Sequence, residues 1–181
     1  MSIRVEKATP NDVPLILELI RGLAEYERLS RDVEATEDRV REALFGARPD
    51  AEVILARDGD RPAGFALFFH TFSTFLGRRG LYLEDLFVKP EFRGRGIGKR
   101  LMVELARISI DRGCGRFEWT VLDWNEPAIG FYKRLGAKML NQWVICRVDG
   151  DALPRLAAQM VGDASASPNA AADHHGPGKG G

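Results

Sequence analysis

The spacing of apolar residues changes several times along the chain, and each change predicts a different element. Residues 3–7 alternate apolar with polar side chains, which is typical of a short strand. Residues 13–29 then repeat apolar side chains every three or four positions after the capping segment 9–12, which predicts an amphipathic helix. A second helix is expected over residues 36–46, because acidic residues open it and a glycine can end it.

The remaining periodicity predicts a chain in which strands and helices alternate. Two apolar strands, 52–57 and 63–72, flank Asp58-Gly59-Asp60, a hairpin signal. The later elements are a strand over 81–88, a helix over 98–111, a strand over 116–122, a helix over 126–135, a strand over 141–148 and a short helix over 151–161. The expected order is β-α-α-β-β-β-α-β-α-β. Because the fourth strand, its helix and the fifth strand form a crossover, those two strands should be parallel in a mixed, mostly antiparallel α+β sheet.

Length and composition indicate one folded domain followed by a tail. The chain has 181 residues, of which 45% are hydrophobic and 29% are charged, as in a globular protein that buries a full core. We assign residues 1–161 to this domain. Residues 162–181 contain little that can be buried, so they are expected to be disordered.

The charge balance argues against a large nucleic-acid or membrane surface. Basic and acidic side chains number 26 each, which gives no overall field for such partners. The start resembles no signal peptide, and no apolar run is long enough to span a bilayer, so a cytoplasmic location is expected. Cys114 and Cys146 are interpreted as structural thiols, and the pair His174-His175 lacks further ligands, so no metal site is expected.

A basic, glycine-rich segment between the 81–88 strand and the next helix is the clearest sign of chemistry. Gly94, Gly96 and Gly98 allow a tight turn and a close approach of the backbone to a ligand. The first turn of the helix leaves N–H groups without intrahelical acceptors, at the positive end of its dipole. Cationic side chains surround the turn: Arg93, Arg95, Lys99 and Arg100. The segment is therefore a candidate phosphate site.

Two better-known phosphate motifs do not fit this segment. A P-loop needs a longer glycine spacing and a hydroxyl after the lysine, whereas Arg100 follows Lys99 here. The dinucleotide fingerprint G-x-G-x-x-G also fails, because the glycines read G-x-G-x-G. The remaining pattern, Arg93-x-x-Gly96-x-Gly98, resembles the R/Q-x-x-G-x-G/A loop of the GCN5-related N-acetyltransferases (GNAT). In that family the loop grips the pyrophosphate of acetyl-CoA.

A second motif strengthens this resemblance. Asn125, Ala128, Tyr132 and Gly136 are spaced as in the family's N-x-x-A-x-x-x-Y-x-x-x-G helix. The sequence of this motif, of residues 82–85 and of residues 24–27 is most similar to the diamine (spermidine/spermine) and thialysine N-acetyltransferase branch. The resemblance covers about residues 3–150. The resemblance implies the GNAT fold, an acetyl-CoA-dependent transfer to a primary amine of a small molecule, no metal, and a homodimer.

The resemblance also implies roles for individual residues. The backbone of the fourth strand would pair with the pantetheine arm through Leu86, Phe87 and Val88. The loop would bind the pyrophosphate through Arg93, Gly94, Arg95, Gly96, Ile97, Gly98 and Lys99. Asn125 would hold the pantetheine or the acetyl group, a role compatible with capping the following helix.

The catalytic and substrate residues follow from the same comparison. Tyr132 would protonate the leaving thiolate as general acid, and Glu84 would deprotonate the amine as general base. Asp85 is the alternative base, since regular strand alternation sends neighbouring side chains to opposite faces. Tyr26 and Glu27 would contact the amine substrate.

The identity of the amine stays open at this stage. The diamine branch carries an acidic pair before its last strand, whereas residues 138–143 contain no acid. Spermidine or spermine would lack one anionic partner, so thialysine, a lysine-like amino acid and another small amine are comparable alternatives. Acetylation of a protein amine and a catalytically silent CoA-binding sensor are the competing functions, and a nucleic-acid-binding module is disfavoured by the neutral charge.

Overall fold

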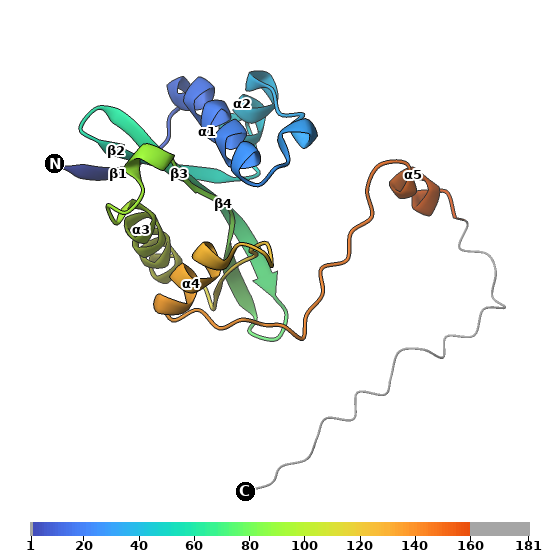
Figure 1. Ribbon diagram of the computed structural model, residues 1–181. Helices are drawn as coiled ribbons and strands as arrows, with labels where there is room; N and C mark the ends of the chain where they lie inside the picture. Colours follow the sequence, from blue (N-terminus) through green and yellow to red (C-terminus); the bar gives the residue numbers. More distant parts are fainter. Residues whose placement is uncertain (1, 160–181) are drawn as a thin grey trace, which may run out of the picture. The chain divides into compact units, whose positions relative to one another are not determined.

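The computed structural model describes residues 2–159, which include a five-stranded sheet; its strands β1 to β4 are labelled in Figure 1. The strands lie in chain order: β1 (Ile3–Lys7), β2 (Glu52–Asp58), β3 (Arg61–Ser73), β4 (Arg78–Val88) and β5 (Phe117–Trp119). Neighbouring strands are antiparallel except β4 and β5, which are parallel. The mixed, mostly antiparallel α+β fold and the parallel crossover are therefore confirmed.

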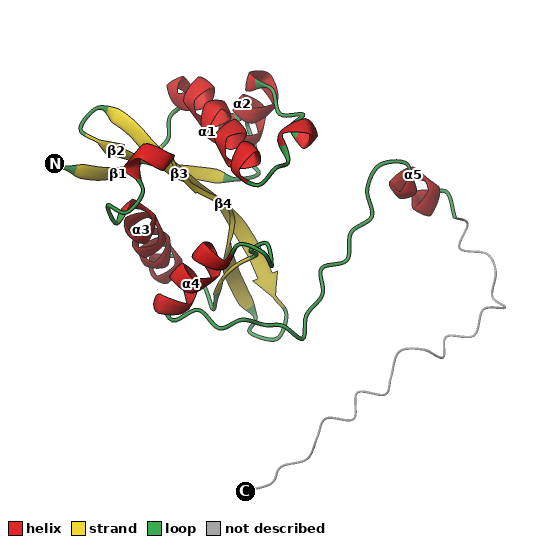
Figure 2. Ribbon diagram, viewed as in Figure 1, coloured by secondary structure: helices red, strands yellow, loops and turns green. Residues whose placement is uncertain are grey.

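Figure 2 draws the helices in red, and α1, α2 and α3 flank the sheet. The α-helices are α1 (Val13–Tyr26), α2 (Glu37–Phe45), α3 (Ile97–Asp111), α4 (Glu126–Arg134) and α5 (Ala152–Ala157). Short 3₁₀ turns are η1 (Pro10–Asp12), η2 (Ser30–Asp32) and η3 (Pro90–Phe92). The capping signals act as expected at α2, where the Thr36 hydroxyl accepts a hydrogen bond from the Arg39 N–H.

The buried side chains of the core lie on both faces of the sheet. On one face, α1 and α2 bury Ile16, Leu19 and Leu44 against sheet residues that include Phe65 and Phe87. On the other face, α3 packs with Leu101 and Leu105 fully buried. The two faces explain why β2 and β3 read as nearly continuous apolar runs, because both sides of these strands are covered.

By its contacts the chain divides into two compact units, with the division after Gly130 inside α4. The first unit contains the sheet and α1 to α3. The second contains the end of α4, an extended segment and α5. The predicted helix over 151–161 corresponds to α5. The tail 162–181 and the pair His174-His175 lie outside the described residues.

The predicted last strand over residues 141–148 is wrong, because the structure assigns no strand to it. Its apolar side chains are exposed: Trp143 by 72%, Val144 by 82% and Ile145 by 68%. Alternation of side chains specifies faces, whereas a strand exists only through ladder hydrogen bonds to a neighbour. The element order is therefore β-α-α-β-β-β-α-β-α-α, and β5 is also shorter than expected. None of the helices within residues 2–159 is long and apolar enough to cross a membrane.

Candidate active site

A break in the register of β4 organises the site. Leu67 of β3 pairs with Asp85, whereas the next residue, Phe68, pairs with Leu83. Glu84 is left without a register partner, as the extra residue of a β-bulge. In a regular strand residues 83 and 85 would share a face. The bulge instead places Leu83 on the α3 face with Phe68, and Asp85 on the α1 face with Leu67.

The bulge gives the two neighbouring carboxylates different surroundings. Glu84 is exposed, while Asp85 is half-buried. Burial, and after it the negative charges of Glu84 and Glu27, together raise the pKa of Asp85 to about 6. The assumption of regular alternation, which set Glu84 against Asp85, does not hold at this bulge. Both carboxylates remain candidates for the base.

Glu27, at the end of α1, completes an acidic cluster with Glu84 and Asp85. It is half-buried, and this burial raises its pKa. Three carboxylates whose charges interact at the end of α1 and the middle of β4 create a negative potential. Such a potential favours a cationic ligand such as an ammonium group.

Tyr26 and Asn125, two expected site residues far apart in sequence, lie in contact. The Tyr26 hydroxyl donates to the Asn125 side-chain oxygen, Oδ1, over 3.2 Å. The same oxygen accepts the Ala128 N–H at 3.3 Å, so Asn125 caps α4 as anticipated. Asn125 is 6% exposed, and its side-chain NH₂ donates no hydrogen bond within the described chain. That NH₂ group is available to a ligand.

Arg93 has a structural part in the site that the sequence did not indicate. Its Nε donates to the Val88 carbonyl at 3.0 Å. Its guanidinium lies 4.6 Å from the centre of the Tyr26 ring and 5.8 Å from that of Phe87. Arg93 therefore fastens the glycine-rich loop to the end of β4 and to α1. It is not a freely mobile cation.

The other basic residues of the loop differ in how they are held. Arg95 forms an ion pair with Asp58 at 3.4 Å, and Arg100 donates to the Ile3 carbonyl at 3.3 Å. The Lys99 side chain makes no hydrogen bond or ion pair with any residue the structure describes. Of the expected phosphate-binding cations, Lys99 is thus the one whose charge is uncommitted.

The backbone of the loop has the geometry of an anion site. Gly94 and Gly96 have φ of +75° and +76°, and a Cβ added at either would meet no atom within 4 Å. Gly96 caps α3 without a side chain, and the first bond of the helix runs from the Arg100 N–H to the Gly96 carbonyl at 3.0 Å. The N–H groups of Ile97, Gly98 and Lys99 precede this bond, so they have no acceptor within the helix.

The edge of β4 beyond Leu83 is free of β5. The parallel pairing joins only Leu81, Tyr82 and Leu83 to β5. From Glu84 to Val88 this edge has no strand partner among residues 2–159. An extended ligand with amide groups could pair there as an additional strand, as expected for Leu86, Phe87 and Val88.

Tyr132 belongs to the second unit and is buried in α4, with 8% of its surface exposed. Its ring centre lies 5.2 Å from that of Phe131. The helix that Asn125 caps therefore carries Tyr132 close to its C-terminal end. This is the position in α4 that the motif spacing requires.

Sequence reasoning missed Arg28. It is the single non-glycine residue with positive φ in the described chain, at +64°. Its guanidinium lies 5.5 Å from the centre of the Trp124 ring. The sequence indicates it only indirectly: an arginine stands just after the helix end, where glycine is preferred.

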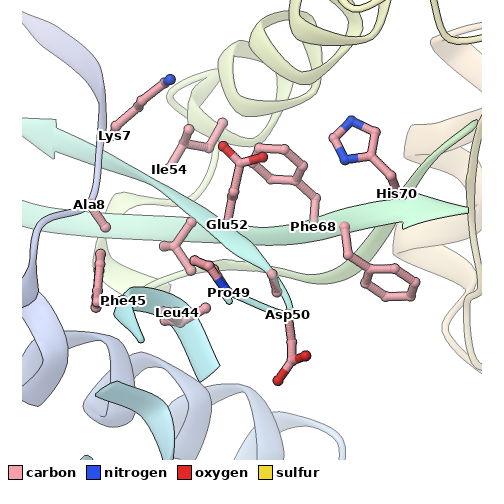
Figure 3. Close-up of a pocket in the computed structure, with 13 residues that line it drawn as sticks. Lys7, Ala8, Leu44, Phe45, Pro49, Asp50, Glu52, Ile54, Phe68 and His70 are labelled. Carbon is pink, nitrogen blue, oxygen red and sulfur yellow. The ribbon is translucent and has the colours of Figure 1, made fainter. Parts of the chain in front are cut away.

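The sequence also gave no sign of a pocket of about 460 Å³ between the end of β1, β2, β3 and the segment after α2 (Figure 3). Glu52 and His70 border it, and Figure 3 shows both on the same side of the sheet as Phe68. Arg112 forms a two-pronged ion pair with Glu52 and lies 3.4 Å from His70 Nε2. None of the expected site residues lines this pocket.

Comparison with known proteins agrees with the geometry of the loop. The sequence profile of the Acetyltransferase (GNAT) family matches residues 16–137. The chain belongs to this family. The match covers both motifs, from α1 through the glycine-rich loop to the end of α4.

Relatives with assigned activities match nearly the whole chain. The thialysine N-epsilon-acetyltransferase of Sus scrofa is 38% identical over 169 residues, which cover 87% of this chain and 99% of that protein. The L-ornithine N5-acetyltransferase of Arabidopsis thaliana is 34% identical and covers 86% of this chain and 88% of its own length. An integron cassette protein from the mobile metagenome of V. cholerae has a solved structure with TM-score 0.75 and 30% identity, covering 88% of this chain and 99% of its own.

Proposed function

We propose that this GNAT enzyme transfers an acetyl group from acetyl-CoA to a primary amine of a small molecule. The observation that carries the proposal is the acidic cluster of Glu27, Glu84 and Asp85 beside the free edge of β4. This arrangement places a site that favours a cation beside a strand edge that can pair with an extended chain of amides. The thialysine and ornithine acetyltransferases among the relatives support an amine of this kind.

The residues present fit acetyl-CoA. The unpaired N–H groups of Ile97, Gly98 and Lys99, with the Lys99 charge, suit a pyrophosphate. The open space beside Gly94 and Gly96 admits it closely. The free edge of Leu86, Phe87 and Val88 suits the amides of pantetheine. When bound, acetyl-CoA supplies a thioester, whose carbonyl carbon accepts the amine.

The carboxylates prepare the amine for attack. An ammonium group held by Glu27 loses a proton to Glu84 or Asp85, directly or through water. A carboxylate with a pKa near 6 is ionised at neutral pH and is a stronger base than an ordinary aspartate. The freed nitrogen lone pair forms the new C–N bond.

Tyr132 acts as the general acid in this proposal. As the C–S bond breaks, its phenol gives a proton to the departing sulfur. The free NH₂ of Asn125 donates to a carbonyl of the bound acyl-CoA. The net reaction consumes the ammonium form of the amine and the thioester, and it releases the amide, a thiol and one proton.

The exposed apolar side chains of Trp143, Val144 and Ile145 support a homodimer that covers them. We place this dimer in the cytoplasm. Light scattering at micromolar concentration should give twice the mass of the chain, and a monomer would contradict the dimer.

The deciding experiment incubates the full chain with acetyl-CoA and a panel of primary amines, and follows release of free thiol. Lysine, ornithine, thialysine, putrescine, cadaverine and spermidine form the small-molecule arm, and a lysine-rich peptide forms the protein arm. Saturable thiol release with at least one small amine, lost in Tyr132→Phe, supports the proposal. Release only with the peptide, or none with any amine, overturns it.

A further inference from the structure

Arg28 occupies a backbone position that ordinarily selects glycine. The Leu29 N–H donates to the Ala24 carbonyl at 2.8 Å, and the Arg28 N–H donates to the Glu25 carbonyl at 3.2 Å. These two bonds form a Schellman motif at the end of α1, with Arg28 at its left-handed position. An arginine kept where glycine is easier points to a use for its side chain.

The Arg28 side chain has a cationic edge that the protein leaves uncovered. The guanidinium carbon lies 5.5 Å from the centre of the Trp124 ring, and Trp124 is itself 47% exposed. No carboxylate within residues 2–159 forms an ion pair with Arg28, although Glu25 and Glu27 are close to it in sequence. Stacking on an indole uses the face of a guanidinium and leaves its N–H fork free for a planar anion.

Arg28 also stands at the border of the acidic cluster. Glu27 is the adjacent residue, and Trp124 precedes Asn125, whose side chain holds Tyr26. A negative region that attracts an ammonium thus adjoins an unpaired guanidinium that attracts a carboxylate. This charge arrangement is complementary to a small molecule that carries an amine at one end and a carboxylate at the other.

We propose that Arg28, stacked on Trp124, binds the α-carboxylate of a basic amino acid whose side-chain amine is acetylated. This inference rests on the proposed function and names its substrate class. The guanidinium forms a bidentate hydrogen-bonded pair with the carboxylate, which fixes the orientation of the substrate. The diamine formed by decarboxylation has a hydrogen in place of the carboxylate, so it cannot form this pair with the guanidinium. Its second ammonium group is instead repelled by the positive charge of Arg28.

Two pairs of amines test the inference, each an amino acid and its decarboxylated counterpart: lysine with cadaverine, and ornithine with putrescine. The wild-type chain should acetylate the amino acid of each pair with at least about tenfold higher kcat/KM. Arg28→Gln should lower kcat/KM for the amino acids about tenfold or more, mainly through KM, and leave the diamines unchanged or improved. Lysinamide, which lacks the carboxylate, should behave as cadaverine does.

Arg31→Gln is the matched control, because it removes one exposed positive charge three residues away. It should leave all four rate constants unchanged, whereas Arg28→Lys should restore part of the preference for amino acids. The role of Arg28 is overturned if the wild type has equal kcat/KM within each pair, or if Arg28→Gln lowers kcat/KM equally for both members. Either result leaves the proposed function standing. Acetylation of none of the four amines overturns the proposed function together with this inference.

Discussion

The phenol of Tyr26 and the side-chain oxygen of Asn125 are joined by a hydrogen bond of 3.2 Å, which ties the last residue of α1 to the cap of α4. Both residues come from the motifs that identify the chain by sequence, and the bond makes them one unit. Arg93 of the glycine-rich loop covers the same Tyr26 ring. The C-terminal end of α1, the loop and the start of α4 are therefore connected by a single aromatic side chain.

Tyr26→Phe should separate the hydrogen bond from the stacking. The ring still lies under Arg93, while Asn125 loses one donor and keeps the Ala128 N–H. We expect the free energy of unfolding to fall by about 1 kcal/mol. Urea denaturation measures this change. A fall of several kcal/mol would mean that the hydroxyl supports more of the fold than this one bond.

Asp85→Asn should stabilise the protein at alkaline pH. The native pKa of about 6 lies above the ordinary value of 3.8, so the wild-type stability due to this group is full below about 3.8 and is lost as pH rises through about 6. A neutral amide avoids that loss. At pH 8 we expect a gain on the order of 2 kcal/mol, which vanishes near pH 3.5. Denaturation midpoints at both pH values measure it, with the exposed Asp60→Asn as the control that should show no gain.

Gly96→Val should weaken acetyl-CoA binding by well over about tenfold, because its Cβ would occupy the space of the phosphate. Gly59→Val is a matched control in the β2–β3 hairpin. Gly59 also has positive φ, +62°, and also has no atom within 4 Å of an added Cβ. Both variants should lose similar stability, whereas calorimetry should detect weaker binding in Gly96→Val alone. Unchanged affinity in Gly96→Val would remove the loop from the site.

Tyr132→Phe should lower kcat by about 10² or more and leave the KM for acetyl-CoA nearly unchanged. The ring still packs in α4, and only the transferable proton is lost. Steady-state kinetics with a saturating amine give both constants, and circular dichroism checks that the fold is retained. A KM that rises as much as kcat falls would indicate a binding role.

Glu84→Gln should lower kcat/KM for the amine at pH 7, and the loss should shrink as pH rises, because more of the amine then arrives deprotonated. Asp85→Asn is examined beside it from pH 6 to 10. If Asp85→Asn shows this rescue and Glu84→Gln keeps full activity, the half-buried carboxylate is the base. If neither substitution matters, solvent alone deprotonates the amine.

The sequence by itself determined the features that depend on residue type and local spacing. The apolar period of α1 and α3, the hairpin at Gly59 and the caps at Thr36 and Asn125 act between residues close in the chain, so their patterns could be read directly. The same holds for the glycine-rich loop, because positive φ at Gly94 and Gly96 is a local requirement of the turn.

Only the tertiary structure decided the features that depend on a distant partner. The bulge at Glu84 arises from pairing with β3 and puts Asp85 on the α1 face beside Glu27, which sets its pKa. The sequence predicts a phosphate-binding role for Arg93, and the structure adds its contacts with Val88 and Tyr26. The apolar alternation of residues 141–148 lacks a strand because hydrogen-bonded partners are chosen by the fold, not by the segment. Side-chain periodicity encodes which face of an element is apolar. Only three-dimensional packing determines which side chains that face contacts and which hydrogen-bond partners its backbone finds.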